Sequence, residues 1–260
     1  MQAPKIHATA IVDVSAELDS SVEIGAYSII GANVKIDAGT RIAGHVMING
    51  PTVIGKNNHI FQYSSLGEAP QDKKYNGEPT SLQIGDNNTI REFCTFNRGT
   101  VQDKNITKIG SDNWIMAYVH IAHDCQIGNH TILANNASLA GHVDINDYAI
   151  LGGFTLVHQF CKIGSHVITA VGSVVFKDIP PYVTAAGYEA KPHGVNAEGL
   201  KRRGYTTESI LQIKRAYKAL YRSGLTLDEA KIELAIMQKT TPEIKLLTDF
   251  LNVSTRGIVR

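Results

Sequence analysis

Two histidines and an aspartate lie close together in the stretch HIAHDC, residues 120–125. His120 and His123 are three residues apart, and Asp124 directly follows the second histidine. Imidazole has an unperturbed pKa of roughly 6.5, which suits proton transfer near neutral pH. The stretch therefore fits a general base, although polar residues that happen to fall on a turn are an equally simple interpretation.

A six-residue repeat predicts the fold that must position these side chains. From residue 12 an aliphatic residue recurs at every sixth position: Val12, Leu18, Ile24, Ile30, Ile36, Ile42, Ile48, Ile54, Ile60 and Leu66. The column returns at Ile84, Ile90 and Phe96, and again from Ile109 to Ile163. A helix has a period of 3.6 and an alternating strand a period of two, so neither explains six. A parallel β-helix of short strands and turns does.

The hexads resemble the hexapeptide-repeat family, whose prisms have three six-residue faces per coil and wind left-handed, against the usual crossover rule. Under that resemblance, positions eighteen apart stack at roughly 4.8 Å, the spacing of neighbouring strands. Gly141 then lies over His123, and Gln159 over Gly141. The stacked coils gather into one patch His123, Asp124, His142 and His158, with His120 half a face away. One outward histidine is most simply a solvated side chain, whereas four on adjacent coils favour a proton-transfer site.

This patch offers the two groups that acyl transfer requires at the least. One is a base that removes a proton from a hydroxyl, and the other is a hydrogen-bond donor that stabilises the developing oxyanion. Gly141 suits the donor role, because without a side chain it lets an acyl carbonyl approach its backbone N–H. A G-x-S-x-G motif is absent from the sequence, and Cys125 and Cys161 occupy inward positions of the hexads. Direct attack by the acceptor is therefore simpler than an acyl-enzyme.

Two segments depart from the repeat. Residues 67–83 are polar and carry no hexad, so we expect a loop that could cover a site, with Asp72 and Lys74 as candidates or as inert solvated charges. After a β-helix spanning residues 1–190, residues 191–260 predict a small α-helical domain. Its helices are expected at 207–222, from the capping box TLDE at 226–229, and from Thr241 and Pro242.

The start of the helical domain is basic. Its charges are Lys201, Arg202, Arg203, Lys214, Arg215 and Lys218. They form either a solvated helix face or a surface that binds phosphate or an acidic carrier protein.

The amino-acid composition and net charge exclude some classes of binding partner and location. The chain has 260 residues, 43% of them hydrophobic, and a net charge of +1, which argues against a nucleic-acid-binding surface. It has neither a charged leader followed by an apolar run nor eighteen consecutive apolar residues, so we expect no secretion and no membrane span. Three cysteines without a C-x-x-C pair fit a cytoplasmic location.

Four segments together resemble the acyl-carrier-protein:UDP-N-acetylglucosamine O-acyltransferase family, whose members begin lipid A synthesis. They are HIAHDCQIGNHTILANNASLAGHV, VHQFCKIG, GEAPQDKKYNGEPT and VNAEGLKRRG. The match runs from the first hexads to STRGIVR at residues 254–260. Its specificity lies in the combination, since hexads alone occur in many unrelated transferases and binding proteins.

The resemblance implies transfer of an (R)-3-hydroxyacyl group from acyl carrier protein to the 3-hydroxyl of UDP-N-acetylglucosamine, in a homotrimer with sites between subunits. The donor is the phosphopantetheine thioester of the carrier, so neither a separate cofactor nor a metal is implied. Carried over, His123 is the general base supported by Asp124, and the Gly141 N–H is the oxyanion donor. Assigned to the sugar and acyl region are Asp72, Lys74, His120, His142, His158 and Gln159. Assigned to the nucleotide and its phosphates are Asn196, Glu198, Arg202 and Arg203, the arginines because a guanidinium donates two hydrogen bonds at once.

In the same family a residue on a late coil limits the depth of the acyl groove, and alignment places Val171, within ITAVGS, at that position. A valine there predicts a shorter acyl chain than in relatives with glycine.

Three other functions remain open at this point. A sister family of N-acyltransferases carries an extra N-terminal domain, for which hexads that begin by Val12 leave no room. A zinc carbonic anhydrase on this fold uses three histidines across a subunit boundary, and the histidine patch permits this. A non-enzymatic scaffold would use the prism alone.

Overall fold

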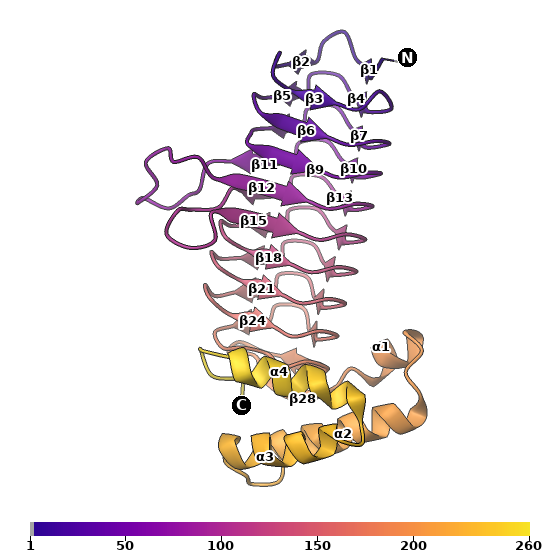
Figure 1. The fold of residues 1–260 in the computed structure, drawn as a ribbon, viewed down its shortest axis with the longest axis vertical. Coiled ribbons are helices and arrows are strands. Elements are labelled where there is room, and N and C mark those ends of the chain that lie inside the picture. Colours follow the sequence, from indigo (N-terminus) through magenta and orange to yellow (C-terminus); the bar gives the residue numbers. More distant parts are fainter. Residues whose placement is uncertain (1–2) are drawn as a thin grey trace.

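The computed structural model describes residues 3–260 and shows a three-sided prism of parallel strands, capped at its C-terminal end by helices (Figure 1). Within the prism, a strand pairs in parallel with the strands one coil before and one coil after it, and the strands form sheets of 11, 9 and 8 members. The repeat therefore forms the expected parallel β-helix, and its coils stack along one axis.

The strands are short, and each sheet collects every third strand until the last two strands of the chain, which both extend the first sheet. The first sheet contains β1 (Lys5–Ile6), β4 (Glu23–Ile24), β7 (Arg41–Ile42), β10 (His59–Ile60), β13 (Thr89–Ile90), β16 (Trp114–Ile115), β19 (Ile132–Leu133), β22 (Ile150–Leu151), β25 (Ile168–Thr169), β27 (Val183–Ala186) and β28 (Lys191–Val195). The second contains β2 (Ile11–Val12), β5 (Ile29–Ile30), β8 (Met47–Ile48), β11 (Ser65–Glu68), β14 (Thr95–Asn97), β17 (His120–Ile121), β20 (Ser138–Leu139), β23 (Leu156–Val157) and β26 (Val174–Val175). The third contains β3 (Glu17–Leu18), β6 (Val34–Ile36), β9 (Thr52–Ile54), β12 (Ser81–Ile84), β15 (Ile106–Ile109), β18 (Gln126–Ile127), β21 (Asp144–Ile145) and β24 (Lys162–Ile163).

The hexad residues fill the interior, as the repeat predicts. Ile30 pairs in register with Ile48, eighteen residues later, and both side chains are buried. Thr52 and Ile54 are buried while Val53 between them is exposed, because successive side chains of a strand point to opposite faces. The core is therefore a set of stacked aliphatic columns, and each coil depends on its neighbours for burial.

Many corners of the prism have a residue with a left-handed backbone. Asp124, His142 and Phe160 occupy successive coils at one corner and have φ values of 61°, 65° and 65°. A positive φ is uncommon outside glycine, although aspartate and histidine are enriched there. This backbone geometry sets the direction in which the corner side chains project, a detail that the hexad period does not predict.

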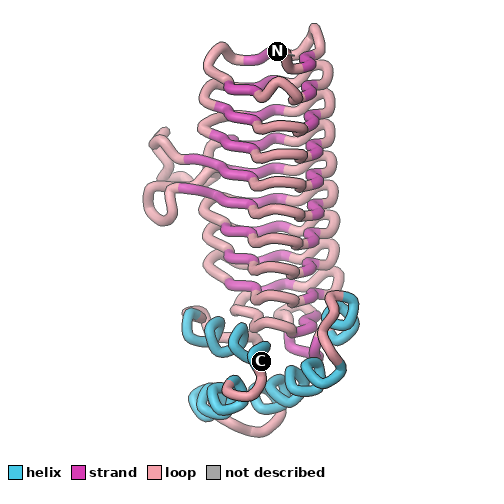
Figure 2. The backbone as a smooth tube through the Cα atoms, turned by 45° about the vertical axis from the view of Figure 1, so that its right-hand side comes forward, coloured by secondary structure: helices cyan, strands magenta, loops and turns pink. Residues whose placement is uncertain are grey.

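Two loops leave the prism on one side, as Figure 2 shows. The first spans residues 69–80, which is shorter than the predicted 67–83 because β11 continues to Glu68 and β12 begins at Ser81. The second spans residues 98–105, between β14 and β15. Both interrupt the hexads without ending the sheets, since β11 pairs with β14 and β12 with β15 across them.

The helices follow an antiparallel hairpin of β27 and β28. They are α1 (Ala197–Arg202), α2 (Thr207–Tyr221), α3 (Leu227–Gln238), the 3₁₀ turn η1 (Pro242–Ile244) and α4 (Lys245–Val253). The helix expected at 207–222 and the capping box of Thr226 and Glu229 are confirmed. Thr241 precedes the 3₁₀ turn rather than an α-helix, and α1 was not predicted. Within residues 3–260, each helix is too short or too polar to cross a bilayer.

Replacement of a hexad residue should destabilise the prism. Ile30→Ala removes a side chain that is 1% exposed, and we expect it to lower the free energy of unfolding by about 2–5 kcal/mol. Urea unfolding followed by circular dichroism measures this change. The matched control is Ile11→Ala, because Ile11 lies in the same sheet but is 64% exposed. Equal losses in the two variants would contradict the proposed core.

Candidate active site

His123 and Asp124 form a hydrogen-bonded pair at the corner between β17 and β18. The Nδ1 atom of His123 lies 2.9 Å from Oδ2 of Asp124. An ionised carboxylate only accepts hydrogen bonds, so Nδ1 carries the proton and donates it. Nε2 of the neutral ring is then left with its lone pair, which is the arrangement that a general base requires.

Asp124 is held as an ion inside the protein. Its side chain is fully buried, and it accepts hydrogen bonds from the Thr100 N–H at 3.0 Å and the Thr100 hydroxyl at 2.6 Å. Burial by itself raises the pKa of Asp124, but the hydrogen bonds from His123 and Thr100 and the nearby imidazole of His142 outweigh it, and the pKa is lowered. The carboxylate can therefore stabilise a protonated His123.

Gly141 lies directly against the ring of His123. A Cβ atom at this position would lie 2.6 Å from Cε1 and 2.7 Å from Nε2 of His123, so any side chain would displace the ring. Among residues 3–260, the Gly141 N–H donates to no protein acceptor. Glycine thus serves two purposes, because it makes room for the imidazole and leaves a free N–H donor one coil away.

His142 is restrained on three sides. Its ring stacks on Phe160 with centroids 4.2 Å apart and planes at 5°, and it meets the His123 ring edge-on at 4.9 Å and 89°. Its Nδ1 lies 2.6 Å from Oδ2 of Asp103 and 3.8 Å from Oδ2 of Asp124. The predicted meeting of histidines from adjacent coils is confirmed for His123 and His142.

A mostly apolar groove of about 490 Å³ runs along the outer face of the second sheet beside this patch. It is lined by His120, Ser138, Leu139, Ala140, Leu156, Val157, His158, Val174, Phe176 and Tyr188. Burial lowers the pKa of His120, the proximity of His123 lowers it further, and a hydrogen bond with Thr95 opposes these effects. The groove is therefore an apolar channel with two imidazoles on its wall. A larger cavity of about 800 Å³, between the third sheet and α4, contains none of the patch residues.

Comparison with known proteins identifies the family. Residues 178–259 match the family model described as Udp N-acetylglucosamine O-acyltransferase, domain 2, and residues 106–141 match bacterial transferase hexapeptide (six repeats). The chain is 61% identical over 259 residues to an acyl-[acyl-carrier-protein]–UDP-N-acetylglucosamine O-acyltransferase of Herminiimonas arsenicoxydans, with 98% of this chain and 99% of that one covered. The chain belongs to the UDP-N-acetylglucosamine O-acyltransferase family.

Solved structures agree with this assignment. The UDP-N-acetylglucosamine acyltransferase of Francisella novicida superposes with a TM-score of 0.97 at 45% identity, covering 98% of this chain and 94% of that one. LpxA of Acinetobacter baumannii gives a TM-score of 0.96 at 50% identity, with 98% and 99% covered. The parallel β-helix expected from the hexads, its left-handed winding expected from the family resemblance, and the C-terminal helical region are thereby confirmed.

The residues that the family resemblance implies fall into separate groups in the structure. His123, Asp124, Gly141 and His142 lie together, and His120 and His158 line the adjoining groove. Gln159 is exposed beside them, with its carbonyl oxygen 3.2 Å from Nδ1 of His158. One chain thus brings together an imidazole–carboxylate pair, a free backbone N–H and an apolar groove.

Asp72 and Lys74 lie apart from this patch. Both are on the 69–80 loop, where the Lys74 N–H donates to Oδ1 of Asp72 at 3.0 Å. Within residues 3–260, neither side chain makes a hydrogen bond or an ion pair with the histidines.

The residues assigned to the nucleotide lie on and beside α1, at the corner between the third and first sheets. The buried Asn196 caps α1 by accepting from the Gly199 N–H, and it donates to the His166 carbonyl at 3.0 Å. The guanidinium of Arg203 lies 5.3 Å from the Tyr148 ring centroid and donates to the Tyr148 carbonyl at 3.1 Å. Glu198 and Arg202 are exposed. This corner differs from that of His123, so one chain does not unite the two groups.

Val171 lies at the turn between β25 and β26 and is 74% exposed. It belongs to the corner between the first and second sheets and is absent from the groove lining on this chain. A role in limiting acyl length would therefore require the groove to extend to that edge of the second sheet.

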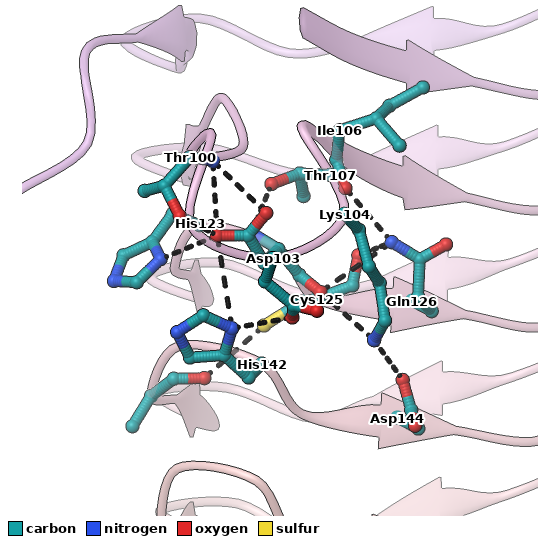
Figure 3. Close-up of polar contacts among 12 residues, drawn as sticks. Thr100, Asp103, Lys104, Ile106, Thr107, His123, Cys125, Gln126, His142 and Asp144 are labelled. Carbon is teal, nitrogen blue, oxygen red and sulfur yellow. Dashed lines mark hydrogen bonds and ion pairs between the residues drawn. The ribbon is translucent and has the colours of Figure 1, made fainter. Parts of the chain in front are cut away.

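The 98–105 loop also contributes to this patch, a contribution that the hexad pattern did not predict. Besides Thr100, which binds Asp124, the loop supplies Asp103 to His142 and Lys104, whose Nζ lies 2.7 Å from Oδ1 of Asp144 (Figure 3). The interruption of the hexads at residues 97–107 was the available signal. It did not indicate which coil the loop would contact.

The cysteines are inert packing residues, as expected from their inward positions. Burial raises the pKa of Cys94 and of Cys125 to about 12 and that of Cys161 to about 11. A thiol with such a pKa carries almost no thiolate at neutral pH, so none of the three is a nucleophile.

Ionised Asp124 should make stability depend on pH. Its pKa is lowered in the folded state, so its contribution is complete above its unfolded pKa, about 3.9, and is lost as the pH falls through the folded pKa. We expect the free-energy difference between wild type and Asp124→Asn to be largest near neutral pH and to shrink below about pH 4. Urea unfolding at several pH values measures it, with Asp112→Asn as the exposed control. A difference independent of pH would contradict an ionised Asp124.

Proposed function

We propose that this protein transfers an (R)-3-hydroxyacyl group from acyl carrier protein to the 3-hydroxyl of UDP-N-acetylglucosamine, the first step of lipid A synthesis. The observation that carries the mechanism is the His123–Asp124 pair against Gly141, at the end of an apolar groove. The names of close relatives supply the substrates, and this arrangement supplies the chemistry between them.

Nε2 of His123 removes the proton from the sugar hydroxyl as its oxygen attacks the thioester carbonyl. Asp124 stabilises the imidazolium that results, and the free Gly141 N–H donates to the oxyanion of the tetrahedral intermediate. Collapse breaks the carbon–sulfur bond, and the departing phosphopantetheine thiolate takes the proton from His123. The products are the sugar ester and the free thiol, with no acyl-enzyme and no cofactor beyond the prosthetic group of the carrier.

The groove along the second sheet is proposed to hold the acyl chain, because its apolar lining favours burial of methylene groups. His120, His158 and Gln159 lie along or beside it and can bind polar groups of the donor and the sugar. The basic residues of α1, Arg202 and Arg203, suit the diphosphate, with Asn196 and Glu198 close by. Asp72 and Lys74 are proposed to bind the sugar from the loop above.

The distribution of these residues supports a homotrimer with sites between subunits. An exposed ladder of stacked rings descends the corner between the first and second sheets, with centroid spacings of 4.8 to 5.3 Å. The ladder consists of Tyr27, His45, Tyr63, Phe93 and Tyr118. An apolar strip of this kind favours burial against another copy, and threefold symmetry closes the assembly. A second chain can then bring its α1 or its 69–80 loop to the patch.

The metal-dependent alternative is less well supported by the contacts. One atom from each of His123, Asp124 and His142 lies within 4.8 Å of the others, which is close enough for a shared cation. Each is already engaged, since Asp124 accepts from His123 and Thr100, and His142 is bound to Asp103. A cation would have to replace these hydrogen bonds.

The free buried cysteines fit a cytoplasmic location.

The decisive experiment compares wild type with His123→Ala in transfer of a radiolabelled (R)-3-hydroxyacyl group from its carrier protein to UDP-N-acetylglucosamine. We expect robust transfer by wild type and a loss on the order of a hundredfold or more in the variant, because the base is gone. His130→Ala, an exposed histidine at another corner, is the matched control and should remain active. Equal transfer by wild type and His123→Ala would move the base elsewhere, and no transfer by wild type would refute the reaction.

Val171 is proposed to limit acyl length. Removal of its side chain in Val171→Gly should shift the preferred donor toward longer chains, measured across a panel of acyl carrier thioesters of increasing length. Val14→Gly, at a fully exposed valine of the first coils, should leave the preference unchanged. An unaltered preference in Val171→Gly would end this interpretation.

A further inference from the structure

One acidic residue of the 98–105 loop contacts the histidine patch without a part in the chemistry described so far. Oδ2 of Asp103 lies 2.6 Å from Nδ1 of His142, a distance typical of a strong charge-assisted hydrogen bond (Figure 3). Among residues 3–260, Asp103 has the only side chain within hydrogen-bonding distance of the His142 ring nitrogens. Asp124 is farther away, at 3.8 Å, and its oxygens already accept from His123 and Thr100.

We propose that Asp103 is a positioning residue that fixes the tautomer and the orientation of His142. An ionised carboxylate accepts but does not donate, so it holds the proton of the neutral ring on Nδ1. Nε2 of His142 then presents a lone pair and accepts a hydrogen bond from a substrate hydroxyl. Without Asp103, the ring is free to place its proton on Nε2, where it would donate instead.

The loop around Asp103 is anchored on both sides, so Asp103, although exposed, is held in place more firmly than a side chain on a free surface loop. Before it, Thr100 binds the buried carboxylate of Asp124 through its N–H and its hydroxyl. After it, Lys104 binds Asp144 on β21 at 2.7 Å. Asp103 is thus held between two attachments to different coils, and ordering of its side chain costs little additional entropy.

The geometry gives the site two carboxylate–histidine pairs of the same kind. Asp124 orients His123, and Asp103 orients His142, with the two rings almost perpendicular at 89°. The Phe160 ring, parallel to His142 within 5°, prevents rotation out of this plane. Two lone pairs of defined direction therefore face the site, one for the proton that moves and one for a hydroxyl that is bound.

This inference rests on the proposed function only for the kinetic part of its test. The tautomer can be read directly in the protein labelled with ¹⁵N-histidine, by two-bond proton–nitrogen correlation, and the His142 signal is assigned by its loss in His142→Gln. We expect the Nδ1–H pattern in wild type. In Asp103→Ala we expect a change toward the Nε2–H pattern, with the His123 signals retained. The control is Asp112→Ala, whose carboxylate lies 3.9 Å from Nε2 of His130, and it should leave His142 unchanged.

The kinetic part measures kcat and KM for UDP-N-acetylglucosamine with the same proteins. We expect kcat/KM for this acceptor to fall about tenfold in Asp103→Ala, the effect of losing one charge-assisted hydrogen bond. The thermal midpoint should stay close to that of wild type. Asp103→Asn, which keeps the shape and one acceptor oxygen, should show a smaller loss and serves if the alanine variant does not fold.

The outcomes separate the two proposals. An Nε2–H pattern in wild type, or an Nδ1–H pattern that persists in both Asp103 variants, would refute the positioning role whatever the activity. If the tautomer of His142 changes in Asp103→Ala as expected, but the wild-type protein has no transferase activity, the positioning role is supported and the proposed reaction is refuted. An unchanged kcat/KM despite a changed tautomer would show that His142 does not accept a substrate hydroxyl through Nε2.

Discussion

The register of one coil on the next is the constraint on which the rest of the structure depends. Each inward aliphatic residue stacks on its equivalent in the neighbouring coil, as Ile121 does on Leu139, and both are fully buried. A slip of one residue would turn every such side chain to the outer face, so the hydrophobic effect fixes the register strongly. The same register also positions the outward and corner residues, although they contribute little to the core.

The geometry of the site depends on this register. His123 and Gly141 are separated by eighteen residues, yet the stacking places them so closely that a single methyl group on Gly141 would displace the imidazole. The corner backbone is left-handed at both Asp124 and His142, which directs their side chains to the same side of the prism. A rigid scaffold therefore fixes the alignment of the imidazole, the carboxylate and the glycine N–H relative to one another.

The loops add what a regular repeat cannot supply. A prism of identical coils offers equivalent corners all along its length. In the part of the chain that the structure describes, residues 3–260, only the corner beside residues 98–105 receives both a carboxylate-binding threonine and a histidine-binding aspartate. Asp124 would otherwise be a buried charge bonded only to His123, which is costly in a low-dielectric interior. The contacts of the inserted loop thus distinguish this corner from the equivalent corners of the coils above and below it.

The sequence by itself determined the prism and most of the helical region. The six-residue period specifies which side chains are buried, and local signals specify the helix that begins at Thr207 and the capping box at Thr226, because these depend on neighbours near in the chain. It also brought His123, Gly141 and His142 together once eighteen residues per coil were assumed from the resemblance. Only the tertiary structure decided the contacts of Thr100 and Asp103, which join residues 24 and 39 positions apart through an irregular loop. No local pattern records such contacts, because the path of that loop is set by the surface on which it packs.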